Sequence, residues 1–268
     1  MTITLASWNV NSLNVRLQHV RNWLESNPVD VLGIQELKLI DEKFPTAAFA
    51  EAGYQTAAFG QPTYNGVAIA HRHEAQDIER NIPGYPDSQS RVISATLNMA
   101  STQIRLVNAY FVNGQEPGSE KFAYKLEWLA HLERYVAEQL AQHQHVVLMG
   151  DFNITASDQD SWDPNGLKET IHHTTIERQA LLRLLALGML DSFRAFEQAE
   201  KSFSWWDYRM LGFQKNRGLR IDYVLISESL RPALTRSWID RAPRKWPKPS
   251  DHAPVLVELD MARLDSST

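Results

Sequence analysis

The chain of 268 residues contains no cysteine. This excludes disulfides, a thiol nucleophile and a zinc–thiolate site. Long apolar runs are also missing: the best candidate, residues 181–190, is interrupted by Arg183 and Gly188 and is shorter than the roughly 20 residues that span a bilayer. The N-terminus lacks a basic segment followed by an apolar core. We therefore expect no signal peptide, no membrane association and a cytoplasmic protein.

An overall excess of basic charge is absent as well, because the net charge is −5. The distribution is uneven, however. Residues 201–250 hold 11 Lys or Arg and 4 Asp or Glu, a local charge of +7, so the remainder carries −12. A basic region on an acidic protein suits a polyanion such as DNA. Chance clustering of charges on solvated loops is the alternative interpretation.

The sequence shows no internal repeat, low-complexity segment or linker, so we predict a single α/β domain over residues 1–268. Hydrophobic periodicity predicts helices at 16–27, 122–140 and 177–190, and a long loop at 157–175. Apolar or alternating runs predict strands at 3–8, 29–34, 54–59, 66–71, 92–97, 104–112, 146–149, 221–226 and 255–259.

The segment HVVLMGDFN at residues 145–153 is the most informative local pattern. Its apolar run is typical of a strand buried on both faces, and we expect the strand to break at Gly150, where glycine allows a sharp turn. Asp151 and Asn153 follow, two residues apart. They either cap the strand in an ordinary Asx-turn or form part of an active site at a strand end.

Other predicted strands also end or begin at polar side chains of catalytic type. These residues are Asn9, Glu36, Tyr110, Asn113, Asp151, Asn153, Asp222, Asp251 and His252. If they converge at one end of a sheet assembly, carboxylate and amide oxygens offer ligands that suit magnesium or manganese, with no thiolate to compete.

Seven motifs resemble those of the exonuclease III type of apurinic/apyrimidinic endonucleases, within the endonuclease–exonuclease–phosphatase superfamily. They are SWNVNSL, GIQELK, NAYFVNG, MGDFNI, FSWWDYR, NRGLRIDYVL and PSDHAPV, and they run in order from about Ile3 to Leu259. The resemblance implies an α/β four-layer sandwich, in which two mainly antiparallel sheets pack face to face with helices on both outer sides.

The same resemblance implies a metal site and a base. Glu36 looks like the principal magnesium ligand, with Asn9 and Asp251 close by, and Mn²⁺ is a possible substitute. Asp151 looks like the base that orients or deprotonates the attacking water. The proton transfer is left open between Asp151 and Tyr110, and so is the number of metals.

The phosphate contacts are implied in the same way. Asn153 looks like a donor to the phosphate, and His252 like a phosphate-contacting imidazole held by Asp222. A carboxylate behind a histidine fixes its tautomer and raises its pKa. Tyr110 looks like a phosphate or leaving-group contact, and Asn113 like a second phosphate contact.

A tyrosine and an apolar pocket suggest what kind of substrate the protein binds. Tyr110 stands where the deoxyribonuclease-like and phosphatase-like branches usually have histidine, which favours the DNA-repair branch. Trp205, Leu219 and Ile221 match positions that line a pocket for a base-free sugar, which reads damage by shape. Trp205 and Trp206 as plain core residues are the alternative. Arg217 and Arg220 are expected beside this pocket as DNA contacts.

Three departures from the family pattern stand out. Ser12 replaces the usual glycine, and Gln115 sits in a short acidic turn where relatives often carry a longer loop. His172 and His173 occupy a loop that usually has a small residue next to the sugar pocket. They either narrow this entrance, and attract phosphate when protonated, or simply face solvent.

The leading function is a magnesium-dependent DNA-repair phosphodiesterase that acts on double-stranded DNA as a monomer. Its substrates would be abasic sites, nicks or blocked 3′ ends. Because of His172 and His173, a specialised 3′-phosphodiesterase or 3′-phosphatase with little abasic endonuclease activity is a second hypothesis. A phosphoesterase of small molecules is a third, and an inactive DNA-binding module is a fourth. The sequence does not give the balance of the nuclease activities.

Overall fold

Two six-stranded sheets form the centre of the protein, and a computed structural model describes residues 1–99 and 102–265. The first sheet contains, in spatial order, β13 (Leu234–Ile239), β14 (Val255–Asp260), β1 (Thr2–Asn9), β2 (Val31–Gln35), β4 (Val67–His71) and β3 (Gln55–Phe59). The second contains β5 (Glu74–Arg80), β6 (Val92–Met99), β7 (Thr102–Tyr110), β8 (Val146–Asp151), β12 (Asp222–Ser227) and β9 (Met189–Asp191). Only β1–β2 and β7–β8 are parallel pairs among these neighbours.

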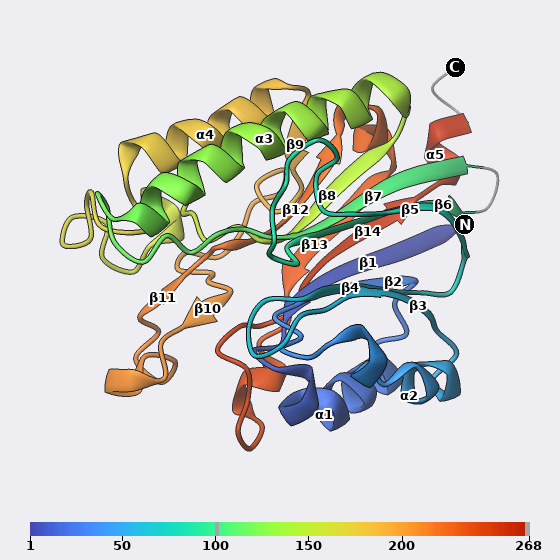
Figure 1. Ribbon diagram of the computed structural model, residues 1–268, viewed down its shortest axis with the longest axis horizontal. Coiled ribbons are helices and arrows are strands. Elements are labelled where there is room, and N and C mark those ends of the chain that lie inside the picture. The colour runs from blue at the N-terminus through green and yellow to red at the C-terminus, as the bar shows by residue number, and fades with distance from the viewer. Residues whose placement is uncertain (100–101, 266–268) are drawn as a thin grey trace.

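The two sheets pack face to face and helices cover their outer faces (Figure 1). Leu5 and Ile69 of the first sheet share one buried cluster with Leu106 and Met149 of the second. In Figure 1, α1 (Leu13–Ser26) and α2 (Thr46–Glu51) lie on one side of the sheets, and α3 (Glu120–Gln142) and α4 (Thr175–Ala186) lie on the other. The predicted four-layer sandwich is confirmed.

Helices α3 and α4 begin at side chains that satisfy free backbone N–H groups. Ser119 accepts a hydrogen bond from the N–H of Phe122 at the start of α3, and Thr174 and Glu177 form a capping box at the start of α4. The predicted helix at 177–190 was therefore placed wrongly at both ends. It begins two residues earlier, at the capping box, and its last predicted residues belong to β9. Among the described residues, no helix is long and apolar enough to cross a membrane.

Short elements complete the chain. These are α5 (Ala262–Asp265), the hairpin strands β10 (Trp205–Trp206) and β11 (Gly218–Leu219), and the 3₁₀ turns η1 (Asp41–Lys43), η2 (Asp158–Asp160), η3 (Arg209–Leu211), η4 (Glu228–Ala233) and η5 (Ala242–Lys245). The β10–β11 hairpin extends away from the sheets in Figure 1.

Gly150 does not break its strand, contrary to the prediction, since β8 continues to Asp151. The glycine is needed for a close approach. A Cβ atom at this position would lie 1.8 Å from the carbonyl oxygen of Ala109 on the neighbouring strand β7, and φ is +149°. Any larger residue would separate β7 from β8 directly behind Tyr110 and Asp151, which are register partners.

Candidate active site

The predicted site residues converge at one end of both sheets. β1 ends at Asn9, β2 leads into Glu36, and β7 ends at Tyr110. Asp151 at the end of β8 is the register partner both of Tyr110 and of Asp222, the first residue of the antiparallel strand β12. The strand register therefore places these side chains at the same level along neighbouring strands. This explains why residues that are far apart in the sequence form one compact cluster.

Glu36, Asp151 and His252 form a group whose ligand-type atoms all lie within 4.8 Å of one another. Asn9 bridges it, because its Nδ2 atom donates to Glu36 Oε1 and to Asp151 Oδ2, both at 2.9 Å. Oxygen and imidazole donors in this arrangement are a donor set that fits a divalent cation. The structure thus contains a candidate metal site centred on Glu36.

The two other predicted metal ligands are placed differently. Asn9 turns its amide nitrogen toward the carboxylates, while its oxygen accepts from the N–H of Asn11, so it is a hydrogen-bond donor here. Both oxygens of Asp251 are occupied, by Nδ2 of Asn11 and by Nε1 of Trp205 at 3.0 Å. The three-residue cluster found among the described residues does not include Asp251, and metal ligation by Asn9 and Asp251 stays a prediction.

His252 lies between two aspartates, as predicted for Asp222. Nδ1 of His252 lies 2.9 Å from Asp222 Oδ2, and Nε2 lies 3.6 Å from Asp151 Oδ2. Burial lowers the pKa of His252, but the negative charges of Asp222 and Asp151 outweigh burial and raise it well above its ordinary value. The protonated imidazole is therefore favoured, and its Nδ1–H donates to Asp222.

Asp151 is buried, and this burial raises its pKa. The positive charge of His252 opposes the rise, while the negative charges of Asp222 and Glu36 add to it. Three carboxylates around one imidazolium leave an excess of negative charge. A divalent cation at Glu36 would relieve this excess and favour the ionised form of Asp151.

Tyr110 contacts the same cluster from β7. Burial, together with the charges of Glu36 and Asp151, raises its pKa well above the ordinary value, and its hydroxyl is hydrogen-bonded with Glu36. The guanidinium of Arg91 lies 5.1 Å from its ring centre. A raised pKa favours the protonated phenol, which can donate a hydrogen bond.

Asn153 and Asn113 lie next to each other beside Asp151. Asn113 Nδ2 donates to Asn153 Oδ1 at 3.1 Å, and Asn153 Nδ2 donates to the carbonyl of Phe111 and to Asp151 Oδ2. The backbone of Asn153 is left-handed, with φ of +51°. This conformation turns its amide back toward the carboxylate at the strand end, where a phosphate contact is expected.

Trp205 and Leu219 lie side by side, and a sugar pocket lined by them and Ile221 stays a prediction. Trp205 and Leu219 are register partners in the β10–β11 hairpin, and Trp205 also bridges to His252. Leu219 and Ile221 are buried. Trp206 is fully buried against Phe213, so the core interpretation is right for Trp206, whereas Trp205 borders the site.

Arg220 is not a DNA contact, and that prediction is wrong. Its side chain is 1% exposed. Nε lies 2.6 Å from Asp160 Oδ1, and Nη2 lies 2.8 Å from Asp191 Oδ2. These two ion pairs connect the loop at Asp160 to β9, so the guanidinium of Arg220 is not free to bind DNA. Arg217 differs: it is exposed, and its guanidinium lies 5.0 Å from the ring centre of Trp162.

The structure buries His173 and leaves His172 half-buried. His173 is 3% exposed, and its Nε2 lies 2.9 Å from Ser161 Oγ. Nδ1 of His172 lies 2.6 Å from the carbonyl oxygen of Asn153, so Nδ1 carries the hydrogen. Burial, together with the charge of Lys125, lowers the pKa of His172 to about 3. Burial also lowers the pKa of His173, so both shifts work against the attraction of phosphate by protonated imidazoles.

Sequence reasoning missed two lysines of the site. Lys38 Nζ lies 2.8 Å from Glu36 Oε2 and 2.6 Å from Asn11 Oδ1. Its signal was present, since Lys38 ends the GIQELK motif. Lys125 lies behind Asn113 and Asn153, buried and paired with Glu177. Only its position on the apolar face of a predicted helix hinted at this.

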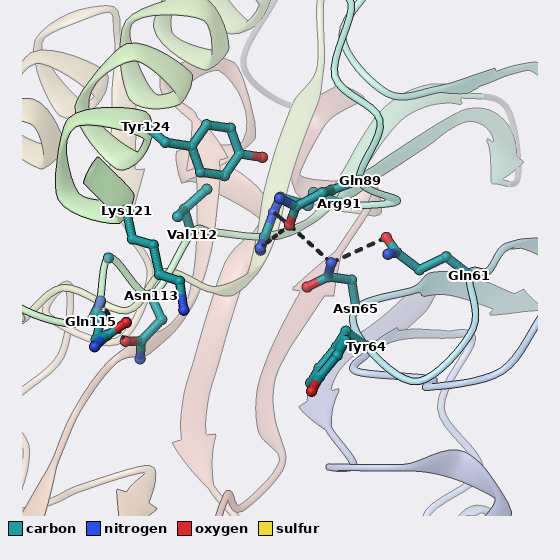
Figure 2. A pocket seen from close by; sticks show the side chains of 11 residues that line it. Gln61, Tyr64, Asn65, Gln89, Arg91, Val112, Asn113, Gln115, Lys121 and Tyr124 are labelled. Atoms are coloured by element: carbon teal, nitrogen blue, oxygen red, sulfur yellow. Dashed lines mark hydrogen bonds between the residues drawn. The ribbon is translucent and has the colours of Figure 1, made fainter. Parts of the chain in front are cut away.

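A pocket of about 580 Å³ adjoins the site beyond Tyr110. Figure 2 shows Gln61, Tyr64 and Asn65 on one side of it, and Asn113 and Lys121 on the other. Arg91 lines it as well, and none of its described lining residues is acidic. Amides, phenols and two cations next to a carboxylate cluster form a surface that suits an anionic polymer.

Comparison with known proteins decides the family. The model of the Endonuclease/Exonuclease/phosphatase family matches residues 6–252. The chain belongs to this family. It is also 35% identical over 264 residues to exodeoxyribonuclease III of Haemophilus influenzae, covering 94% of this chain and 98% of that one.

Solved structures agree with this membership. A 3′ phosphatase from Neisseria, bound to a product DNA hairpin, has a TM-score of 0.93 and 44% identity, covering 96% of this chain and 99% of that one. An AP endonuclease from Archaeoglobus fulgidus has a TM-score of 0.91 and 33% identity, covering 97% of this chain and 100% of that one. The predicted resemblance is confirmed, and so is the prediction of a DNA-repair nuclease, a phosphodiester hydrolase.

Proposed function

We propose that this chain is a magnesium-dependent DNA-repair phosphodiesterase that acts on double-stranded DNA at abasic sites, nicks or blocked 3′ ends. The observation that carries the proposal is the convergence of Glu36, Asp151 and the Asp222–His252 pair at one end of both sheets. Because one chain supplies every group, we propose a monomer with a single catalytic domain. We also propose a cytoplasmic location, because similar proteins are named as DNA nucleases.

Glu36 would be the principal ligand of the metal ion, with Asn9 and Asp251 close by. Hard carboxylate oxygens favour Mg²⁺, with Mn²⁺ as a substitute. When bound, the ion would supply positive charge against the oxygens of the scissile phosphate. Lys38 is a cation already paired with Glu36, and this ion pair helps to orient the carboxylate toward the cluster.

The side chains of this chain would carry out the proton transfers and stabilise the charge that develops on the phosphate. Asp151 accepts a proton from the water whose oxygen attacks phosphorus, and the bond from phosphorus to the 3′ oxygen breaks. The imidazolium of His252 and the amides of Asn153 and Asn113 donate to the phosphate oxygens as charge builds on them. The protonated phenol of Tyr110 donates to the departing oxygen.

The DNA is expected to run from the pocket of Figure 2 across the site to the β10–β11 hairpin. Arg91 and Lys121 line the pocket at one end, and Lys215 and Arg217 lie on the hairpin connection at the other. The sugar of the damaged nucleotide would enter beside Trp205, Leu219 and Ile221.

Bias toward 3′ ends is a second candidate function, and His172 favours it. This residue has a left-handed backbone with φ of +71°, and its ring contacts Asn153. A bulky neutral imidazole there narrows the entrance more for a flipped internal abasic site than for a free 3′ end. The 44% identical Neisseria protein is named a 3′ phosphatase.

One assay tests both proposals. Duplexes with an internal abasic site, and nicked duplexes with a 3′-phosphate, are incubated with the protein in Mg²⁺, in EDTA, and in EDTA followed by excess Mg²⁺. We expect activity that EDTA abolishes and Mg²⁺ restores. Activity that persists in EDTA, or no turnover of either DNA, refutes the enzyme proposal.

The His172→Gly variant tests the bias separately. Glycine adopts the left-handed backbone easily, so this change removes the ring with little strain. We expect internal abasic cleavage to rise relative to removal of the 3′-phosphate. His173 is buried, so only His172 is changed. An unchanged ratio, or efficient abasic cleavage by the unmodified protein, refutes the bias and leaves the general nuclease proposal intact.

A further inference from the structure

Lys125 is a fully buried cation behind the phosphate-facing side of the site. It projects from α3 and has 0% of its side chain exposed. Its Nζ donates to the carbonyl oxygens of Asn113 at 3.1 Å and Asn153 at 2.8 Å, and to Glu177 Oε1 at 2.5 Å. The three hydrogens of the ammonium thus have three acceptors, each from a different segment of the chain.

Glu177 extends this contact to the loop that carries His172. Its Oε1 also accepts from the backbone N–H of His172 at 3.2 Å, and its Oε2 accepts from Thr174 Oγ1 at 2.6 Å. The N–H bond helps to hold the left-handed backbone of His172. The Asn153 carbonyl receives both Lys125 Nζ and Nδ1 of His172. One buried ion pair therefore joins both asparagine segments to the His172 loop.

We infer that Lys125, through its pair with Glu177, is a positioning residue that sets Asn113, Asn153 and His172 relative to Asp151 for phosphodiester hydrolysis. The inference rests on the proposed function. A buried charge is costly unless all its partners are in place, so the ammonium makes one arrangement of the three segments much more stable than others. Misplacing a substrate-contacting group by about 1 Å can cost roughly 10²-fold in rate.

The test begins with Lys125→Met. We expect kcat to fall by roughly 10²-fold, while KM for DNA changes little because contacts to other phosphates remain. Backbone amide exchange should become faster at Thr155, whose N–H bonds to the His172 carbonyl, and at His172. A merely structural role would lower thermal stability without this division between kcat and KM.

The matched control is Arg105→Met. Arg105 is another buried cation, 2% exposed and bonded to Glu79 and Gln139. It lies on β7 opposite Val146, at the far end of β8 from Asp151. This variant should lose stability as well, but keep kcat and the exchange rates at Thr155 and His172.

A double variant guards against misfolding. Lys125→Met with Glu177→Leu replaces both charges by apolar groups of similar size, which is often tolerated in protein interiors. We expect it to fold and still lose kcat. A folded double variant with unchanged kcat and unchanged exchange at Thr155 and His172 would overturn the inference. If the unmodified protein cleaves no DNA, the proposed function fails, and the exchange rates alone still decide the role of Lys125.

Discussion

His252 and Asp222 form a buried pair in which Nδ1 lies 2.9 Å from Oδ2, and this pair sets the charge of the site. Because Asp222 raises the pKa of His252, the imidazole stays positively charged and can bind phosphate. Asp222→Asn should lower that pKa, so the alkaline limb of the kcat/KM profile shifts to lower pH. If the alkaline limb of the pH–rate profile of the variant were unchanged, His252 would not act as a charged phosphate-binding group.

Glu36→Gln should weaken the use of metal. The neutral amide loses the charge that attracts a divalent ion, and it loses the ion pair with Lys38. Activity at low Mg²⁺ should fall by orders of magnitude and recover in part at high Mg²⁺. Titration of activity against Mg²⁺ measures this shift. A variant with the unmodified protein's Mg²⁺ dependence would place the metal elsewhere.

Salt dependence should separate Arg217 from Arg220. Lys215→Ala and Arg217→Ala should each lower the slope of log affinity against log salt by roughly 0.9, as expected for one lost phosphate contact. Arg220→Met should leave the slope unchanged and cost about 3–5 kcal/mol of stability, because Asp160 and Asp191 lose a buried partner. Binding isotherms at several salt concentrations, with thermal unfolding, test both statements.

Acid stability should depend on Asp160. Burial alone would raise its pKa, but the charges and hydrogen bonds of Arg220 and Arg194 outweigh burial and lower it. The ionised carboxylate therefore adds stability above its unfolded pKa of about 4, and this is lost as pH falls through the lower folded pKa. Asp160→Asn should be less stable than the unmodified protein at pH 7, with a difference that shrinks in acid. A difference independent of pH would exclude this ionic role.

The sequence predicted those strands and site residues for which an apolar run leads directly into a polar residue. Strands that end at or directly before Asn9, Glu36, Tyr110 and Asp151 could be placed because each apolar run leads into its polar residue. The edge strand β5 could not, since most of its residues are exposed and polar and it has no apolar face to reveal it.

Ion pairs between residues distant in the sequence could not be predicted from such local patterns. Arg220 looks like a DNA contact until Asp160, 60 residues away, is seen to hold it. Lys125 and Glu177 are separated by 52 residues, on different helices. In both cases burial decides the role of the charge, and burial depends on how the layers pack.

Asp151→Asn is the most direct test of the central claim that this cluster hydrolyses phosphodiesters in DNA. Asp151 is assigned to proton transfer, which contributes roughly 10²–10⁴-fold to rate, and DNA binding relies on other groups. Single-turnover cleavage and equilibrium binding should be measured on the same nicked and abasic duplexes. The account predicts a loss of cleavage of at least about 10²-fold with affinity retained. A variant that cleaves as fast as the unmodified protein, or that loses affinity as much as rate, would contradict it.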